Sequence, residues 1–416
     1  MKPNYKLTRL TCFFLYPALA PLFILPPILF VAFRQMYGIS YTLLGTLVLV
    51  NFGVQLGVDL FFSFFKIKFD HKTLLRFTPL LAAIGMLIYG FVPTLFPRYA
   101  YAGLVVGTVV FSMASGLNEV FLSPTLVAVS GENSEKDMSI MHSLYGYGSA
   151  GVAILSTLFL YVFGSENWLY LVLLWATLPV ITFVMLCLSP LPDIVTAEPA
   201  SQRSAKQKRI GLVLCMVCIF LGSAAENTMT NWVSVYMERT LQIPKATGDI
   251  VGLTTFALLL ALTRTVYAKY GRNIYKVLVW GMVGSVVCYL AAGLSSSGAV
   301  AIVACMLTGI CTSMLWPGTL LLMEEKFPNP GVAAYALMAA GGDMGASVAP
   351  QGLGIVADTV AASDWAANIS LQSGLTTEQI GIKAGMLCTV LFPLAGIFLL
   401  LYMKKFFAKI AEKAAD

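Results

Sequence analysis

Residues 189–209 read SPLPDIVTAEPASQRSAKQKR and form a long polar connection in a chain that is otherwise dominated by apolar runs. Six runs of about 20 or more mostly apolar residues precede this connection, and six follow it. A bilayer core of roughly 30 Å is crossed by about 20 apolar residues in a helix. The segment is therefore predicted to be a cytosolic linker between two six-helix halves, residues 1–188 and 210–416.

The composition agrees with a membrane protein. Of the 416 residues, 58% are hydrophobic and only 11% are charged, and the mean hydropathy is +0.82. Soluble domains carry about 25% charged residues, so too little polar surface remains to cover a water-soluble globule. These values argue against a soluble enzyme. The net charge of +6 comes without an aromatic-interleaved basic stripe, so no nucleic-acid partner is predicted.

The apolar runs predict an all-α polytopic membrane protein with twelve transmembrane helices in two pseudosymmetric halves. The predicted spans are 10–33, 41–65, 73–95, 100–128, 139–163, 168–188, 210–237, 249–268, 274–294, 298–323, 332–357 and 379–402.

The basic residues predict the orientation of these spans in a cell membrane. Lys and Arg are concentrated on alternate connections, whereas the other connections hold only Arg34, Arg98, Arg239 and Lys245. Cytoplasmic loops are the ones enriched in Lys and Arg. Both termini are therefore predicted to lie in the cytosol.

Four acids fall inside predicted spans: Asp59, Glu119, Glu226 and Asp343. Each charge at the bilayer centre costs about 2.5 to 3.5 kcal/mol, so these acids are expected to face a wet cavity or one another. Glu119, Glu226 and Asp59 are the candidates for proton coupling, with helix packing as the alternative for each. Asp343 lies among glycines that permit close helix packing, which fits a packing or gating role as well as it fits substrate contact.

Polar and aromatic residues near two of these acids predict a solute site. An amide precedes Glu119, and the seventh span carries a run of amide and hydroxyl side chains after Glu226. The two tryptophans of the predicted site are candidates for stacking on the apolar face of a sugar ring, with ordinary packing as the alternative. The predicted substrate-binding residues are Asn118, Glu119, Glu226, Asn227, Asn231, Trp232 and Trp316.

Two basic side chains are candidates for a gating or conformational role together with Asp343. Arg264 lies about two turns from a cytosolic connection, so it is expected to snorkel to the interface or to pair with an acid on the cytosolic side. His142 follows Lys136 by about a turn and a half, which fits a cytosolic gate, a proton relay or a simple interfacial histidine.

Motifs for nucleotide, metal or nucleophile chemistry are missing from the sequence. It has no phosphate-binding Walker loop, no dinucleotide glycine fingerprint after a strand and no HExxH. We therefore predict no enzymatic activity, no cofactor and no metal site. The energy source that remains is an ion or solute gradient, or an external partner.

Several segments resemble the major facilitator superfamily and, within it, the fucose permease-like sugar:proton symporters. KFDHK at 68–72 and KYGRN at 269–273 resemble the superfamily's loop signature at equivalent places in the two halves. More specific are MHSLYGYGSAG at 141–151, AAENTMTNWVSVYM at 224–237 and the pair WPGTLLLMEEKFP and AAGGDMGASVAPQGLG in the tenth and eleventh spans. The resemblance implies alternating access, with a fourth-span carboxylate, here Glu119, in proton coupling. That group also carries a first-span aspartate, whereas residues 10–33 contain no acid.

The sequence therefore predicts a transporter that imports a small polar solute, a sugar, together with protons, and that works as a monomer in the lipid bilayer. Two alternatives remain open from the residues alone. One is an exporter or a drug or metabolite:proton antiporter on the same fold. The other is a non-transporting membrane receptor or scaffold.

Overall fold

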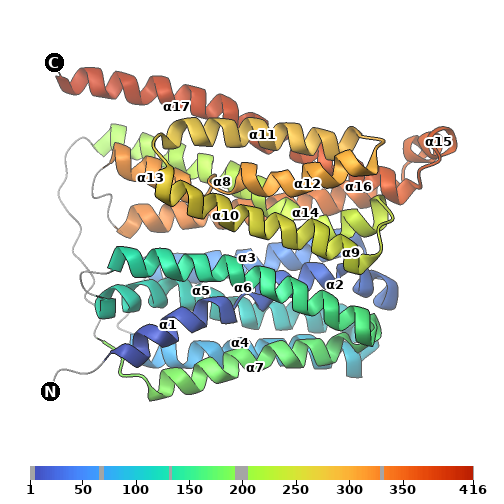
Figure 1. The fold of residues 1–416 in the computed structure, drawn as a ribbon, viewed down its shortest axis with the longest axis horizontal. Helices are drawn as coiled ribbons and strands as arrows, with labels where there is room; N and C mark the ends of the chain where they lie inside the picture. Colours follow the sequence, from blue (N-terminus) through green and yellow to red (C-terminus); the bar gives the residue numbers. More distant parts are fainter. Residues whose placement is uncertain (1–4, 65–69, 131–133, 193–204, 328–331, 416) are drawn as a thin grey trace. The chain divides into compact units, whose positions relative to one another are not determined.

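The computed structural model describes residues 5–64, 70–130, 134–192, 205–327 and 332–415. These residues form helices and contain no β-strand, which confirms the predicted all-α fold (Figure 1). The chain divides into two compact units. The first comprises Met1–Thr196 and Pro244–Leu258, and the second comprises Ala197–Ile243 and Leu259–Asp416.

In the first unit, α5 packs against α3 and α4, and α4 also packs against α7. The short helices that precede α10 pack on α6 within the same unit. The elements of this unit are α1 (Lys6–Ala18), α2 (Pro21–Tyr37), α3 (Tyr41–Phe64), α4 (His71–Leu95), η1 (Pro97–Tyr99), α5 (Ala100–Ser130), α6 (Ser134–Phe163), η3 (Ser165–Asn167), α7 (Trp168–Leu188), α9 (Lys245–Gly248) and the π-helical η5 (Asp249–Thr254).

In the second unit, α14 packs against both α8 and α16, and α11 packs against α12. The elements are α8 (Ala205–Val235), the π-helical η4 (Tyr236–Thr240), α10 (Thr255–Tyr270), whose first turn belongs to the first unit, α11 (Ile274–Leu294), α12 (Gly298–Thr312), α13 (Pro317–Lys326), α14 (Val332–Ala361), α15 (Asp364–Ser373), α16 (Thr377–Thr389) and α17 (Leu391–Ala415).

Among the described residues, 11 helical segments are long and apolar enough to cross a membrane. Each overlaps one predicted span, and the remaining prediction, 332–357, lies within α14. This helix is 30 residues long, but Asp343, Gln351 and several glycines make it less apolar than the others. The structure thus agrees with the prediction in helical content and approximately in the number of spans, with most ends differing by a few residues.

Two of the predicted spans are broken at prolines. The first span is broken into α1 and α2, with Pro17 near the end of one and Pro21 at the start of the other. The tenth span is broken likewise, because α13 begins at Pro317. Proline lacks the N–H that would bond to the carbonyl four residues earlier, so each break leaves backbone acceptors free.

Capping and close packing fix helix positions in both units. Asp70 caps α4 by accepting the backbone N–H of Lys72 at 3.1 Å and the hydroxyl of Thr73. In the second unit, α14 passes close to α8 because Gly345 lies on the Phe220 carbonyl, where a Cβ would overlap it. The position of α8, which carries much of the predicted site, therefore depends on this glycine.

Candidate functional site

One face of α3 carries buried polar side chains at four-residue steps. Asn51 is held against α5, because its Oδ1 accepts the Ser112 hydroxyl at 2.7 Å and the Gln55 amide at 2.9 Å. Asp59 lies one turn beyond Gln55 and is 8% exposed. Its Oδ2 is buried without a hydrogen-bond partner among the described residues.

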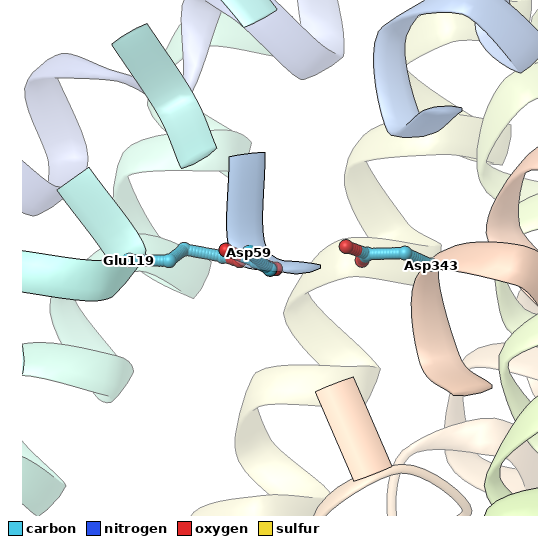
Figure 2. A group of neighbouring side chains, drawn as sticks. All are labelled: Asp59, Glu119 and Asp343. Atoms are coloured by element: carbon cyan, nitrogen blue, oxygen red, sulfur yellow. The ribbon is translucent and has the colours of Figure 1, made fainter. Parts of the chain in front are cut away.

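Asp59 faces a second carboxylate within the first unit. Figure 2 shows the Glu119 side chain extending from α5 toward Asp59 on α3. A carboxylate oxygen of one lies within 4.8 Å of a carboxylate oxygen of the other, and the Glu119 side chain is exposed. In the part of the chain that the structure describes, neither acid forms an ion pair.

This geometry favours the binding of a proton. At about 5 Å and an effective dielectric constant near 20, two carboxylates repel each other by roughly 3 kcal/mol. A proton shared between them removes that repulsion. The neighbouring Asn118 is buried, and its Oδ1 also has no hydrogen-bond partner among the described residues. Asp59 and Glu119 are thus brought together, with Asn118 beside them.

The second unit holds the third of these acids in a different way. Glu226 on α8 pairs with Arg264 on α10: Nη2 of Arg264 donates to Oε1 at 3.0 Å and to Oε2 at 3.1 Å. The side chains are 16% and 34% exposed, respectively. Arg264 thus pairs with an acid, one of the two outcomes expected from the sequence, and that acid lies in the middle of the neighbouring long helix.

A second contact fixes the same guanidinium. Nε of Arg264 donates to the Ser313 carbonyl at 2.8 Å. That carbonyl lies four residues before Pro317, which has no N–H to bond to it. The break between α12 and α13 thus supplies an acceptor for Arg264, and the side chain joins α8, α10 and the end of α12.

Other residues predicted on α8 are largely engaged in local contacts. The Asn227 amide donates to Ser223, and the Asn231 amide donates to the Asn227 carbonyl at 2.8 Å. Trp232 is fully buried, and its Nε1 donates to the Pro350 carbonyl at 3.0 Å. Of these residues, Asn227 is partly exposed, whereas Trp232 serves packing between α8 and α14 in this conformation.

The remaining predicted residues are dispersed within their units. Trp316 is half-buried at the α12–α13 break, with its indole Nε1 against Gly342 on α14. Asp343 follows on α14 and is half-buried. His142 belongs to α6, but its side chain lies outside the described residues.

Two buried acids of the first unit form contacts that the sequence does not predict. Asp137 on α6 is fully buried and accepts two hydrogen bonds from Arg9 on α1, at 2.6 Å from Nε and 2.5 Å from Nη2. Asp249, also buried, accepts the Thr157 hydroxyl at 3.2 Å and pairs with Lys245 at 3.1 Å. Both acids lie at the ends of predicted spans, where acids are common, so no sequence pattern indicates that they are buried.

Comparison with known proteins places the fold in a known class. The sequence model of the Major Facilitator Superfamily matches residues 10–350. No curated protein sequence matches the chain. Among solved structures, a bacterial homolog of the human lysosomal transporter Spinster, inward-facing and occupied, has a TM-score of 0.77 at 11% identity, covering 98% of each chain.

Two further solved structures are similar over almost their full lengths. A D-xylose-proton symporter has a TM-score of 0.74 at 13% identity, covering 97% of this chain and 98% of that one. The fucose:proton symporter of E. coli has a TM-score of 0.60 at 12% identity, covering 96% and 99%. At these identities the similarity establishes the fold alone.

Proposed function

This chain belongs to the major facilitator superfamily, and on that premise we propose that it is a secondary active transporter that imports a small polar solute, a sugar, together with protons. It works as a monomer by alternating access in the cell membrane, with both termini in the cytosol and without a cofactor. Two of the structurally similar proteins are named as sugar:proton symporters, which supports this choice of solute and ion.

The observation that carries the proposal is the pair Asp59 and Glu119. Two carboxylates lie within 4.8 Å, with Glu119 exposed and with no ion-pair partner among the described residues. Proton uptake by Glu119 removes a charge that is costly at bilayer depth and relieves its repulsion with Asp59. The protonated carrier can then reorient with its solute, which links the movement of the two.

Glu226 has a different role in this proposal. Its charge is already balanced by Arg264, so it gains less from a proton than Glu119 does. We assign it to solute contact together with the partly exposed Asn227 and Trp316. The buried Trp232 holds α8 against α14 and supports this site from behind.

The test is transport by reconstituted protein. We expect the Glu119→Gln variant to keep solute counterflow, which needs no proton gradient, and to lose at least tenfold in proton-driven accumulation. Glu166→Gln is the matched control, because Glu166 is an exposed acid in the connection before α7. Proton-driven accumulation that survives in Glu119→Gln would show that this acid is not the coupling residue.

The same vesicles also show whether solute and protons move in the same direction or in opposite directions. An importer accumulates solute when the proton concentration is higher on the side of the solute, whereas an antiporter accumulates it when that gradient is reversed. Accumulation under the reversed gradient would replace the import proposal with export.

A further inference from the structure

Arg264 uses only part of its guanidinium group inside the second unit. Nε bonds to the Ser313 carbonyl, and Nη2 alone contacts both oxygens of Glu226. A fork-shaped pairing would instead use two nitrogens for the two carboxylate oxygens. Within the described residues Nη1 has no hydrogen-bond partner, so its two N–H donors remain available.

Arg264 lies on the side of α10 that faces α8. Leu262 and Val266 on α10 are both exposed, as expected of residues that face lipid. Residues two positions apart in a helix point about 200° apart. Arg264 therefore lies on the opposite side of α10, toward α8, and its 34% exposure is not exposure to the lipid-facing strip.

The two anchors also fix the direction of Nη1. A planar guanidinium held at Nε and at Nη2 has no remaining freedom to rotate. The Ser313 carbonyl is available because Pro317 cannot bond to it. A donor group fixed in this way binds a ligand oxygen without first losing side-chain entropy.

The charges next to Nη1 restrict which ligand fits. Arg264 and Glu226 together are neutral, and Glu226 remains 16% exposed, so it can accept a further hydrogen bond. We propose that Nη1 of Arg264 and the Glu226 carboxylate together bind adjacent hydroxyl groups of a neutral solute. One hydroxyl oxygen accepts from Nη1 while the next hydroxyl donates to Glu226. This inference rests on the proposed transport function and names the substrate class of the same site.

The pair also selects against acidic solutes. A carboxylate can accept from Nη1, but it then lies close to the Glu226 carboxylate, and the two like charges repel in a site of low dielectric constant. A neutral sugar is therefore preferred over the acid that differs from it only by oxidation at one carbon. Arg264 is a specificity-determining residue in this arrangement, in addition to holding three helices together.

The experiment measures binding by the purified full-length protein with matched pairs of probes. Two pairs match a neutral sugar with its acid: D-galactose with D-galacturonate, and D-glucose with D-glucuronate. The third pair, uridine with 2′-deoxyuridine, is neutral throughout and differs in one hydroxyl of a vicinal pair. We expect the wild-type protein to bind a neutral, diol-bearing probe at least tenfold more tightly than its partner.

Two variants distinguish the contribution of the Nη1 donor from that of the charge balance between Arg264 and Glu226. Arg264→Lys keeps a positive charge for Glu226 but has no Nη1, so the neutral probe is expected to bind at least tenfold more weakly. Glu226→Gln leaves an uncompensated positive charge, so the preference for the neutral sugar over its uronate is expected to fall at least tenfold. Arg272→Lys, in an exposed connection, is the control for the first substitution, and unfolding temperatures establish that each variant is folded.

The outcomes separate this inference from the proposed function. If wild-type protein binds a neutral probe and both variants leave its affinity and preference unchanged, the inference is wrong and the sugar transporter stands. Preference of the wild-type protein for a uronate also overturns the inference alone. If wild-type protein binds none of the neutral probes, the proposed function is wrong in naming a sugar as the solute, and this inference is wrong as well.

Discussion

The acids of the two units have opposite electrostatic surroundings. In the first unit, Asp59 and Glu119 approach each other within 4.8 Å, and among the described residues no cation balances them. In the second unit, Glu226 is paired with Arg264, which is itself anchored on a backbone carbonyl. A carboxylate inside an apolar helix therefore meets repulsion in one unit and neutralisation in the other.

This difference suits the two sites to different functions. A carboxylate pair under repulsion changes its interaction energy strongly when it gains a proton, which suits coupling to an ion gradient. A carboxylate balanced by a fixed guanidinium keeps its charge and its geometry, which suits recognition of a solute. Four substitutions test whether the two kinds of acid differ in this way.

The largest effect is expected from Arg264→Ala. It leaves the Glu226 charge unpaired inside the unit, which should lower the free energy of unfolding by about 3 kcal/mol, at the low end for buried pairs because Arg264 is one-third exposed. Denaturant unfolding in detergent micelles measures the change. The double variant Arg264→Ala/Glu226→Ala should recover most of the loss. If the double variant is no more stable than Arg264→Ala, the pairing does not explain the cost.

Gly345→Ala tests whether the position of α8 maintains the pair. The new Cβ overlaps the Phe220 carbonyl, so α8 and α14 must separate, at a cost of about 2 kcal/mol. Gly352→Ala on the same helix is the matched control, since its Cβ meets no atom within 4 Å. Unfolding of both variants gives the comparison. Equal stabilities would mean that the close contact between the helices contributes nothing.

Asp59→Asn should have the opposite sign. It removes one of two mutually repelling charges and leaves the shape of the side chain unchanged, so the free energy of unfolding should rise by about 1 kcal/mol while proton coupling is impaired. Asp137→Asn is the matched control in the same unit, where the acid is bonded to Arg9 and its loss should destabilise. A loss of stability in both variants would contradict the contrast between repelled and paired acids.

The smallest effect is expected at Asp70, an exposed acid that serves as a reference for the buried ones. The hydroxyl of Thr73 donates to its carboxylate and lowers its pKa, with help from the Lys72 backbone N–H. The folded pKa lies below the unfolded value near ~3.9, so this stabilisation is present above that pH and is lost as the pH falls through the folded pKa. Asp70→Asn should therefore flatten the acid limb of a stability profile slightly, and an unchanged limb would exclude the contribution.

The sequence was sufficient for the helices. Apolar runs of bilayer length are a local property of the sequence, so the helices form where these runs lie. Among the described helices that match a predicted span, only α14 is not apolar enough to count as a candidate membrane span. The candidate acids were also found locally, because a charge within an apolar run stands out.

The partners of those acids were not visible in the sequence. Glu226 and Arg264 are 38 residues apart, and their contact depends on side-chain reach and on a carbonyl released by Pro317. For Trp232, by contrast, the helical spacing predicts a position away from Glu226. It lies six positions after Glu226, about 240° around the helix, so the two side chains do not share a face. The structure accordingly buries Trp232 against α14.

The pairing of Glu226 with Arg264 also bears on how the chain enters the membrane during synthesis. Glu226 belongs to the seventh apolar segment and Arg264 to the eighth, so the acid is already inserted when the base emerges. Each charge alone would cost about 2.5 to 3.5 kcal/mol at the bilayer centre, whereas the two together form a neutral hairpin. Correct insertion of the eighth segment thus depends on a residue in the segment made just before it, and losing Glu226 would leave a fraction of newly made chains with that segment misplaced.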